Sequence, residues 1–80
     1  MIQATNTHHE LRIRPQYFQA VIDGKKRFLI RKNDREFQEG DTVELREYQD
    51  AYSGRKISGR ICYISSFAQQ KGWVVLGIII

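Results

Sequence analysis

The spacing of hydrophobic residues constrains this chain most, because only one segment has the period of an α-helix. Phe18 and Val21 lie at helical spacing after Pro15, a residue that suits the first position of a helix. Gly24 is typical of the residue that follows the C-terminal end of a helix. The pattern predicts a helix near residues 15–23, which is too short to be stable without packing against the rest of the chain.

Four other segments alternate between hydrophobic and polar residues, as half-buried strands do. In the last of these four, Ile57, Ile61 and Tyr63 are expected to share one face. A fifth segment follows a loop at residues 65–72, carries no charge and predicts a strand buried on both faces. Turn-forming residues predict a hairpin tip at residues 52–55. The predicted strands are residues 8–14, 27–31, 42–46, 57–63 and 73–80.

One short helix cannot cover a flat sheet of five strands in a chain of 80 residues. Curling the sheet into a barrel buries its apolar face and keeps the apolar final strand away from an open edge. We therefore predict an α+β fold, a small β-barrel of about five strands with one principal helix at one end. Residues 1–7 are expected to be a polar lead-in and residues 8–80 the domain.

Composition excludes several classes of protein. Cys62 is the one cysteine, so no internal disulfide forms, and no cysteine–histidine cluster has zinc spacing. We predict no metal site and no cofactor, and we expect Cys62 to be inert packing. No apolar run approaches the roughly 18 residues of a membrane span, and the polar N-terminus lacks a signal pattern. These features predict a cytoplasmic protein with no membrane partner, and they leave the oligomeric state open.

Positive charge is concentrated in one stretch of the chain. Residues 25–35 hold six basic residues and one acid, a charge of +5, whereas the net charge is +4, so the remainder carries −1. Such a segment suits an anionic partner, and nucleic acid is the commonest one. The alternative is a solvated basic loop without a partner.

The alternation within this stretch predicts which side chains point outward. Phe28 and Ile30 are expected to point into the core, so that Arg27, Leu29 and Arg31 share the outer face. A guanidinium group matches phosphate oxygens in pairs, which makes the arginines candidates for contact with phosphate or nucleobase. Alternatively, they pair with acids on a neighbouring strand. The candidate acids are Glu44 and Glu47.

Histidines and tyrosines provide weaker candidates. His8 and His9 are adjacent, so on a strand they point to opposite faces and cannot easily bind one metal ion. Together with Glu10 they suit acid–base chemistry, but the simpler interpretation is a histidine at the start of a strand, hydrogen-bonded to solvent. Tyr52, in the predicted hairpin tip, is the aromatic residue expected to stack on a base.

The basic stretch also carries a resemblance to a known family. Gly24, Lys26 and Arg31 match the G-x-K-x-x-E-x-R signature of the ASCH domains, which belong to the PUA-like superfamily. Longer segments resemble a group of small bacterial and phage ASCH-like proteins of unknown function, and the likeness extends from about His8 to Gly77. These segments are residues 9–11, 15–18, 30–35, 37–41 and 45–48.

The resemblance implies a pseudo-barrel with a cleft beside the helix, floored by Lys26 and Arg31, and it implies RNA binding. Some small members of the family hydrolyse acetylcytidine with a lysine, a threonine and a distant glutamate. Lys26 matches the lysine, but Leu29 stands at the threonine position and also replaces the glutamate of the signature. Leucine has no acid–base or nucleophilic group, and no acid follows Asp50. We therefore predict no catalytic residue.

The leading hypothesis is an RNA- or nucleotide-binding module that does not act as an enzyme. One alternative is an amidohydrolase of modified nucleosides with a displaced catalytic set built on Lys26. The other is an adaptor whose basic face meets an acidic protein partner. In the leading hypothesis, five cations bind the anion and two further residues contact the base. The five cations are Lys25, Lys26, Arg27, Arg31 and Lys32, and the base-contacting residues are Leu29 and Tyr52.

Overall fold

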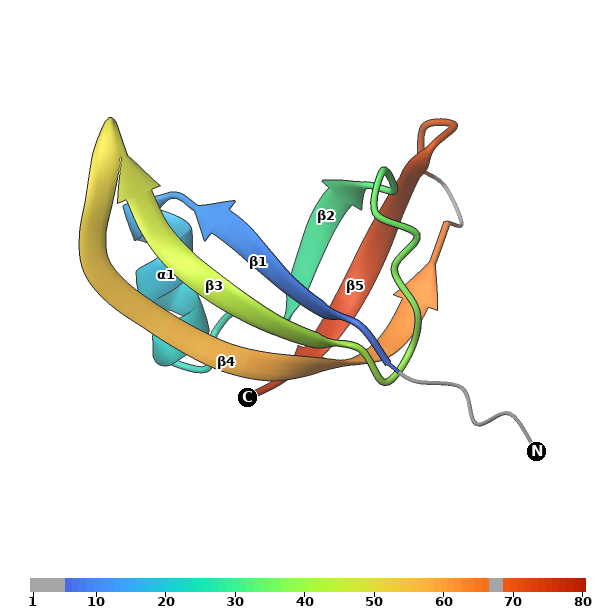
Figure 1. The fold of residues 1–80 in the computed structure, drawn as a ribbon, viewed down its shortest axis with the longest axis horizontal. Coiled ribbons are helices and arrows are strands. Elements are labelled where there is room, and N and C mark those ends of the chain that lie inside the picture. Colours follow the sequence, from blue (N-terminus) through green and yellow to red (C-terminus); the bar gives the residue numbers. More distant parts are fainter. Residues whose placement is uncertain (1–5, 67–68) are drawn as a thin grey trace.

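Five strands form one sheet, and a helix packs against its concave side (Figure 1). The computed structural model describes residues 6–66 and 69–80, so residues 1–5 of the predicted lead-in lie outside the described residues. Within these ranges, the predicted helix and the five predicted strands are all present, which confirms the α+β class. The elements are β1 (His8–Ile13), α1 (Pro15–Ile22), β2 (Phe28–Lys32), β3 (Thr42–Gln49), β4 (Ala51–Ser65) and β5 (Trp73–Ile79).

Helix α1 begins and ends close to the predicted positions. Arg14 is extended, with φ −66° and ψ 151°, and Pro15 starts the first turn, where its missing N–H costs no hydrogen bond. The helix ends at Ile22, and the chain turns away through Gly24, whose φ of +74° favours glycine. No helix in the described ranges is long and apolar enough to cross a membrane.

The sheet has the strand order β1-β3-β4-β5-β2, in which β1 is parallel to β3 and the other neighbours are antiparallel. Strand β4 belongs to both halves of the sheet, because its first part pairs with β3 and its last part pairs with β5. The sheet therefore curls, as Figure 1 shows. In the described part of the chain, no ladder joins β1 to β2, so the predicted barrel is a curled half-barrel.

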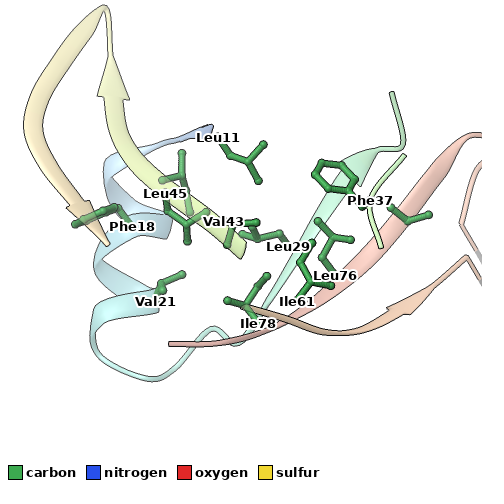
Figure 2. Packing of buried hydrophobic residues seen from close by; sticks show 12 residues of the cluster. Leu11, Phe18, Val21, Leu29, Phe37, Val43, Leu45, Ile61, Leu76 and Ile78 are labelled. Atoms are coloured by element: carbon green, nitrogen blue, oxygen red, sulfur yellow. The ribbon is translucent and has the colours of Figure 1, made fainter. Parts of the chain in front are cut away.

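The hydrophobic core lies between α1 and the concave face of the sheet (Figure 2). Phe18 and Val21 come from the helix, and Val43 and Leu45 come from β3. Burial of these side chains is the main stabilising term in a domain of this size. The buried hydrophobic residues are Leu11, Ile13, Phe18, Val21, Leu29, Phe37, Val43, Leu45, Ile61, Val74, Leu76 and Ile78.

The predicted faces of β2 are wrong. Leu29 is 4% exposed and belongs to the core, whereas Phe28 and Ile30 are 44% and 50% exposed. Arg31 is half-buried on the same side as Leu29. Both faces of this strand carry hydrophobic residues, so alternation alone does not show which face points inward. The curvature of the half-barrel determines which face of β2 points inward. Arg31 can lie on that inner face because the concave side ends at an open seam, where its guanidinium group still reaches solvent.

The prediction that β5 is buried on both faces is also wrong. Val74, Leu76 and Ile78 are buried, but Trp73 and Ile79 on the opposite face are 37% and 61% exposed. The reason is that α1 covers the concave side of the sheet. In the described chain, no second layer covers the convex side (Figure 1).

Strand β4 contains two irregularities that alternation did not predict. Ile61 pairs with Ile78 and Tyr63 pairs with Gly77, so Cys62 is an extra residue at a bulge. The bulge turns Tyr63 outward, away from the face of buried Ile61, and leaves Cys62 exposed rather than packed inside.

The second irregularity lies next to the hairpin between β3 and β4. Gln49 pairs with Ala51, so the turn is at Asp50, with φ 63°, rather than at residues 52–55. Tyr52 therefore lies on the strand, opposite Tyr48, and not in a hairpin tip. Residues 53–55 form an irregular stretch of β4 where the register shifts.

Candidate anion-binding groove

A groove of about 520 Å³ runs along the open seam between the two edge strands, β1 and β2. Buried side chains from both strands and from the loop after β2 form its floor. These are Leu11, Ile13, Leu29 and Phe37. Basic residues line its sides and ends, and we call the whole site the basic groove. The basic residues are Arg12, Arg14, Lys26, Arg31, Lys32 and Arg35.

The charges of the basic groove are not neutralised by neighbours. One acid, Asp34, lines the groove, and none of the six basic residues forms an ion pair within residues 6–66 and 69–80. The acids of β1 and β3 instead pair with cations elsewhere on the sheet. Those pairs are Glu10–Arg46, Glu44–Arg46, Glu44–Lys56 and Glu47–Arg55. The groove is therefore a region of concentrated positive potential.

Two arginines span the seam that the backbone leaves open. Arg31 donates from Nη2 to the backbone carbonyl of Arg12, and Arg35 donates from Nη1 to the carbonyl of Glu10 at 2.7 Å. These carbonyls lie on an edge strand and would otherwise lack a strand partner on that side. The arginines thus hold β1 and β2 together while the rest of each guanidinium group stays free to donate.

Arg31 is a half-buried cation with a like charge beside it. Burial lowers the pKa of its guanidinium group, and the nearby charge of Arg35 lowers it further, while Asp34 acts in the opposite sense. Arginine stays charged even so. An anion stabilises a partly desolvated cation that lies beside a like charge. The geometry therefore suits an acidic ligand.

Lys26 enters the groove from the end of α1. The backbone N–H groups of Lys25 and Lys26 both donate to the carbonyl of Ala20, at 3.0 and 3.1 Å, which closes the helix end. The Lys26 ammonium group lies 4.1 Å from the Phe28 ring centroid and 5.2 Å from that of Tyr17. These cation–π contacts hold the charge at the mouth of the groove.

The structure brings together four of the seven predicted ligand-binding residues. Lys26, Leu29, Arg31 and Lys32 line the groove, although Leu29 does so from the core rather than from an outer face. The other three lie elsewhere. Lys25 is exposed beside the helix end, Arg27 bonds the carbonyl of Gly24 at 3.3 Å and lines a separate hollow, and Tyr52 lies on the outer face of β4.

The alternative pairing of the arginines with Glu44 or Glu47 is wrong. Arg31 on β2 bonds the carbonyl of Arg12, and Arg27, just before β2, bonds the carbonyl of Gly24. Glu44 and Glu47 pair with Arg46, Lys56 and Arg55 instead. Sequence reasoning also missed several groove residues. Arg35 was part of the basic stretch, but nothing local signals that β1 and β5 contribute to the same site. The residues missed are Arg12, Arg14, Tyr17, Arg35 and Trp73.

The two histidines do point to opposite faces, as predicted. His8 is exposed and bonds the hydroxyl of Thr42 at 2.7 Å, whereas His9 is 5% exposed and bonds the carboxylate of Asp41 at 2.8 Å. The interpretation of a histidine at the start of the strand, hydrogen-bonded to solvent, therefore does not hold for His9. Its ring also lies edge-on to Phe37, with centroids 4.7 Å apart, so the pair positions a residue of the groove floor.

Asp41 anchors this buried cluster. Its carboxylate accepts hydrogen bonds from His9 and from the backbone N–H groups of Thr7 and Gln38, at 2.8 to 3.0 Å. Burial opposes the charged form, but these hydrogen bonds prevail and lower the pKa of Asp41. Within the described ranges, no group of three acidic, histidine or cysteine residues is placed to hold a metal ion.

Comparison with protein families matches residues 8–78 to a domain of unknown function, DUF3850. The chain is also similar to a protein of Escherichia phage P2, described as an uncharacterized 12.9 kDa protein in the GpA 3′ region, with 39% identity over 61 residues. The alignment includes 75% of this chain and 56% of the phage protein, so the chain spans just over half the length of that relative. Every residue of the basic groove lies within the family match. The chain therefore belongs to the DUF3850 family.

Proposed function

We propose that this domain is an ASCH-like, PUA-like module that binds RNA or nucleotides in the cytoplasm, and that the basic groove binds their phosphate groups. The resemblance of Gly24, Lys26 and Arg31 to the ASCH signature supports this assignment. Lys26 and Arg31 both line the groove beside the end of α1, where the resemblance implies a ligand cleft.

The observation that carries the proposal is the set of unpaired cations. Six basic residues line one groove with one acid, although acids are available nearby and pair with other cations. Arg31 and Arg35 donate to backbone carbonyls, which satisfy hydrogen bonds but carry no net charge. A phosphate group supplies the missing charge and accepts the paired N–H donors of a guanidinium group.

The proposed ligand set differs from the one that the sequence predicts. Lys26, Arg31 and Lys32 remain proposed phosphate ligands. Arg14 and Arg35 take the places that the sequence assigned to Lys25 and Arg27. Arg12 lies at the boundary between the groove and the outer face of the sheet. The apolar floor and Trp73 offer contact to a base or ribose. The residues of the proposed ligand set all line the one groove: Arg12, Arg14, Lys26, Arg31, Lys32, Arg35 and Trp73.

The test uses the single tryptophan of the chain. Because Trp73 lines the groove and is 37% exposed, its fluorescence reports directly on occupancy. Titration with short RNA and with nucleotides should change this emission. Arg14→Ala and Lys32→Ala should each weaken binding at least about tenfold, because a charge-assisted hydrogen bond contributes about 1.5–3 kcal/mol. Arg31→Ala should cost about 1–3 kcal/mol if its fork contacts a phosphate.

Two lysines outside the groove are matched controls. Lys71 lies in a separate loop, and Lys25 lies in the same basic stretch of the sequence but does not line the groove. Lys71→Ala and Lys25→Ala should leave the affinity within twofold. Equal losses for Arg14→Ala and Lys25→Ala would mean that only general charge matters, and no response to RNA or nucleotides would contradict the proposal.

Neither alternative function has an observation that favours it over phosphate binding. Hydrolysis of acetylcytidine would need a catalytic set displaced from position 29, because the Leu29 side chain has no reactive group and is packed in the core. An acidic protein partner would bind the same cations. An adaptor role therefore predicts that RNA and nucleotides do not change the emission of Trp73.

A further inference from the structure

A second cluster of aromatic and basic side chains lies on the outer face of β1, β3 and β4. The Arg12 guanidinium carbon is 4.6 Å from the ring centroid of Tyr48 and 5.5 Å from that of Tyr52. Arg12 also donates from Nε to the Tyr52 hydroxyl at 2.9 Å. The two tyrosine rings meet edge to face, with centroids 4.9 Å apart. We call Arg12, Tyr48 and Tyr52 the stacking cluster.

The cluster presents both ring surface and uncompensated charge to solvent. Tyr52 is 50% exposed, with the Arg46 guanidinium carbon 6.0 Å from its ring centroid, and Arg12 is also exposed. The neighbouring Arg46 is neutralised by Glu10 and Glu44, at 2.8 and 2.7 Å. By contrast, Arg12 has no acidic partner among the residues that the structure describes. Its fixed charge is thus available to a phosphate that lies beside the rings.

Arg12 belongs to the basic groove and to the stacking cluster at once. Its backbone carbonyl accepts the hydrogen bond from Arg31 on the groove side, while its side chain lies over the tyrosines on the outer side. Because β1 is an edge strand, a ligand can pass around it from one site to the other. Arg14 links the two sites as well, since it lines the groove and a neighbouring hollow that includes Tyr48.

We propose that the ligand is single-stranded nucleic acid, with phosphates in the basic groove and an unpaired base stacked on Tyr52 across the edge of β1. This inference rests on the proposed function and adds the strandedness of the ligand. A duplex keeps its bases paired and stacked internally and offers no free face to a tyrosine ring, whereas an unpaired base stacks on aromatic rings with little sequence preference. Arg12 contacts the phosphate next to the stacked base.

The experiment compares three ligands on the full chain. A uridine octamer is the single-stranded probe, a blunt RNA duplex of the same length is the double-stranded probe, and inorganic pyrophosphate fills the groove alone. Affinity for the two RNAs is measured by fluorescence anisotropy, and pyrophosphate binding is measured by Trp73 emission. The octamer should bind at least tenfold more tightly than the duplex.

Variants at Tyr52 separate the ring from its hydroxyl group. Tyr52→Ser should weaken octamer binding about fivefold or more, since stacking contributes about 1–3 kcal/mol per base, and should leave pyrophosphate binding unchanged. Tyr52→Phe keeps the ring and should bind the octamer within about threefold of the parent chain. Tyr63→Ser is the control, because Tyr63 is 62% exposed on the distant half of β4 and lies outside the cluster.

The outcomes distinguish the two proposals. Weaker pyrophosphate binding in Arg14→Ala, combined with equal octamer affinity for Tyr52→Ser and Tyr63→Ser, would overturn the stacking site and keep the groove. Duplex binding as tight as octamer binding would also overturn it. If neither pyrophosphate nor RNA binds the parent chain, both proposals fall. Thermal unfolding of each variant, followed by circular dichroism, verifies that the fold is retained.

Discussion

At the scale of single residues, Asp41 shows how one buried charge supports the groove. It joins the start of β1 to the loop that carries Phe37 to the groove floor. Asp41→Asn removes the charge and one acceptor, so the free energy of unfolding at neutral pH should fall by about 1–3 kcal/mol. Chemical denaturation at pH 7 measures this loss, and Asp34→Asn, at an exposed position, should change it little.

The pH dependence of the same residue has a definite sign. Because the pKa of Asp41 is lowered in the folded state, its charged form stabilises the fold above the ordinary range of about 4 for aspartate. That stabilisation is lost as the pH falls through the lower, folded-state pKa. The difference between the parent chain and Asp41→Asn should therefore shrink between pH 5 and the acid limit of about pH 2. A difference that stays constant with pH would contradict this account.

At the scale of elements, β4 determines the curvature of the sheet, and Gly59 is the residue that permits it. A Cβ atom at position 59 would lie 2.8 Å from the carbonyl oxygen of Ile79 and 2.9 Å from a methyl carbon of Ile78. Position 59 pairs with Val43, next to the point where β4 passes from β3 to β5. The strand pairing there leaves no room for a side chain.

Gly59→Ala should accordingly destabilise the domain by about 1–3 kcal/mol, as overpacking does. The matched control is Gly77→Ala, since a Cβ atom there meets its nearest neighbours, the Cys62 sulfur and the Tyr63 Cβ atom, at 3.4 Å. Urea denaturation of both variants measures the difference in the free energy of unfolding. Equal free energies of unfolding for Gly59→Ala and Gly77→Ala would show that the close approach at Gly59 does not determine the curvature of β4.

At the scale of the whole molecule, charge is segregated between the basic groove and the rest of the surface. The acids of β1 and β3 pair with Arg46, Lys56 and Arg55, so they do not weaken the field at the seam. Phosphate binding at the seam would displace counterions, and affinity would fall steeply with salt. This dependence is a property of the assembled half-barrel, because the groove cations come from β1, β2 and the segments next to them.

The salt dependence provides a test that is independent of any single affinity. A plot of log affinity against log salt concentration for the uridine octamer should be linear, with a slope of about −0.7 per phosphate contacted. Lys32→Ala should make the slope shallower by about 0.7, whereas Lys71→Ala should leave it unchanged. Equal slopes for the two variants would indicate that Lys32 does not contact phosphate.

The sequence by itself determined the helix at Pro15, the number and order of the strands and the opposite faces of His8 and His9, because each depends on local periodicity. It did not show that β4 begins at Ala51, within the predicted loop before the fourth strand. It also located the excess of positive charge. Tertiary structure alone decided that Leu29 points inward and that Arg14 and Arg31 share a groove. The physical reason is that the groove exists only where two edge strands, β1 and β2, face each other without pairing. Spacing along the chain carries no information about which strands become neighbours.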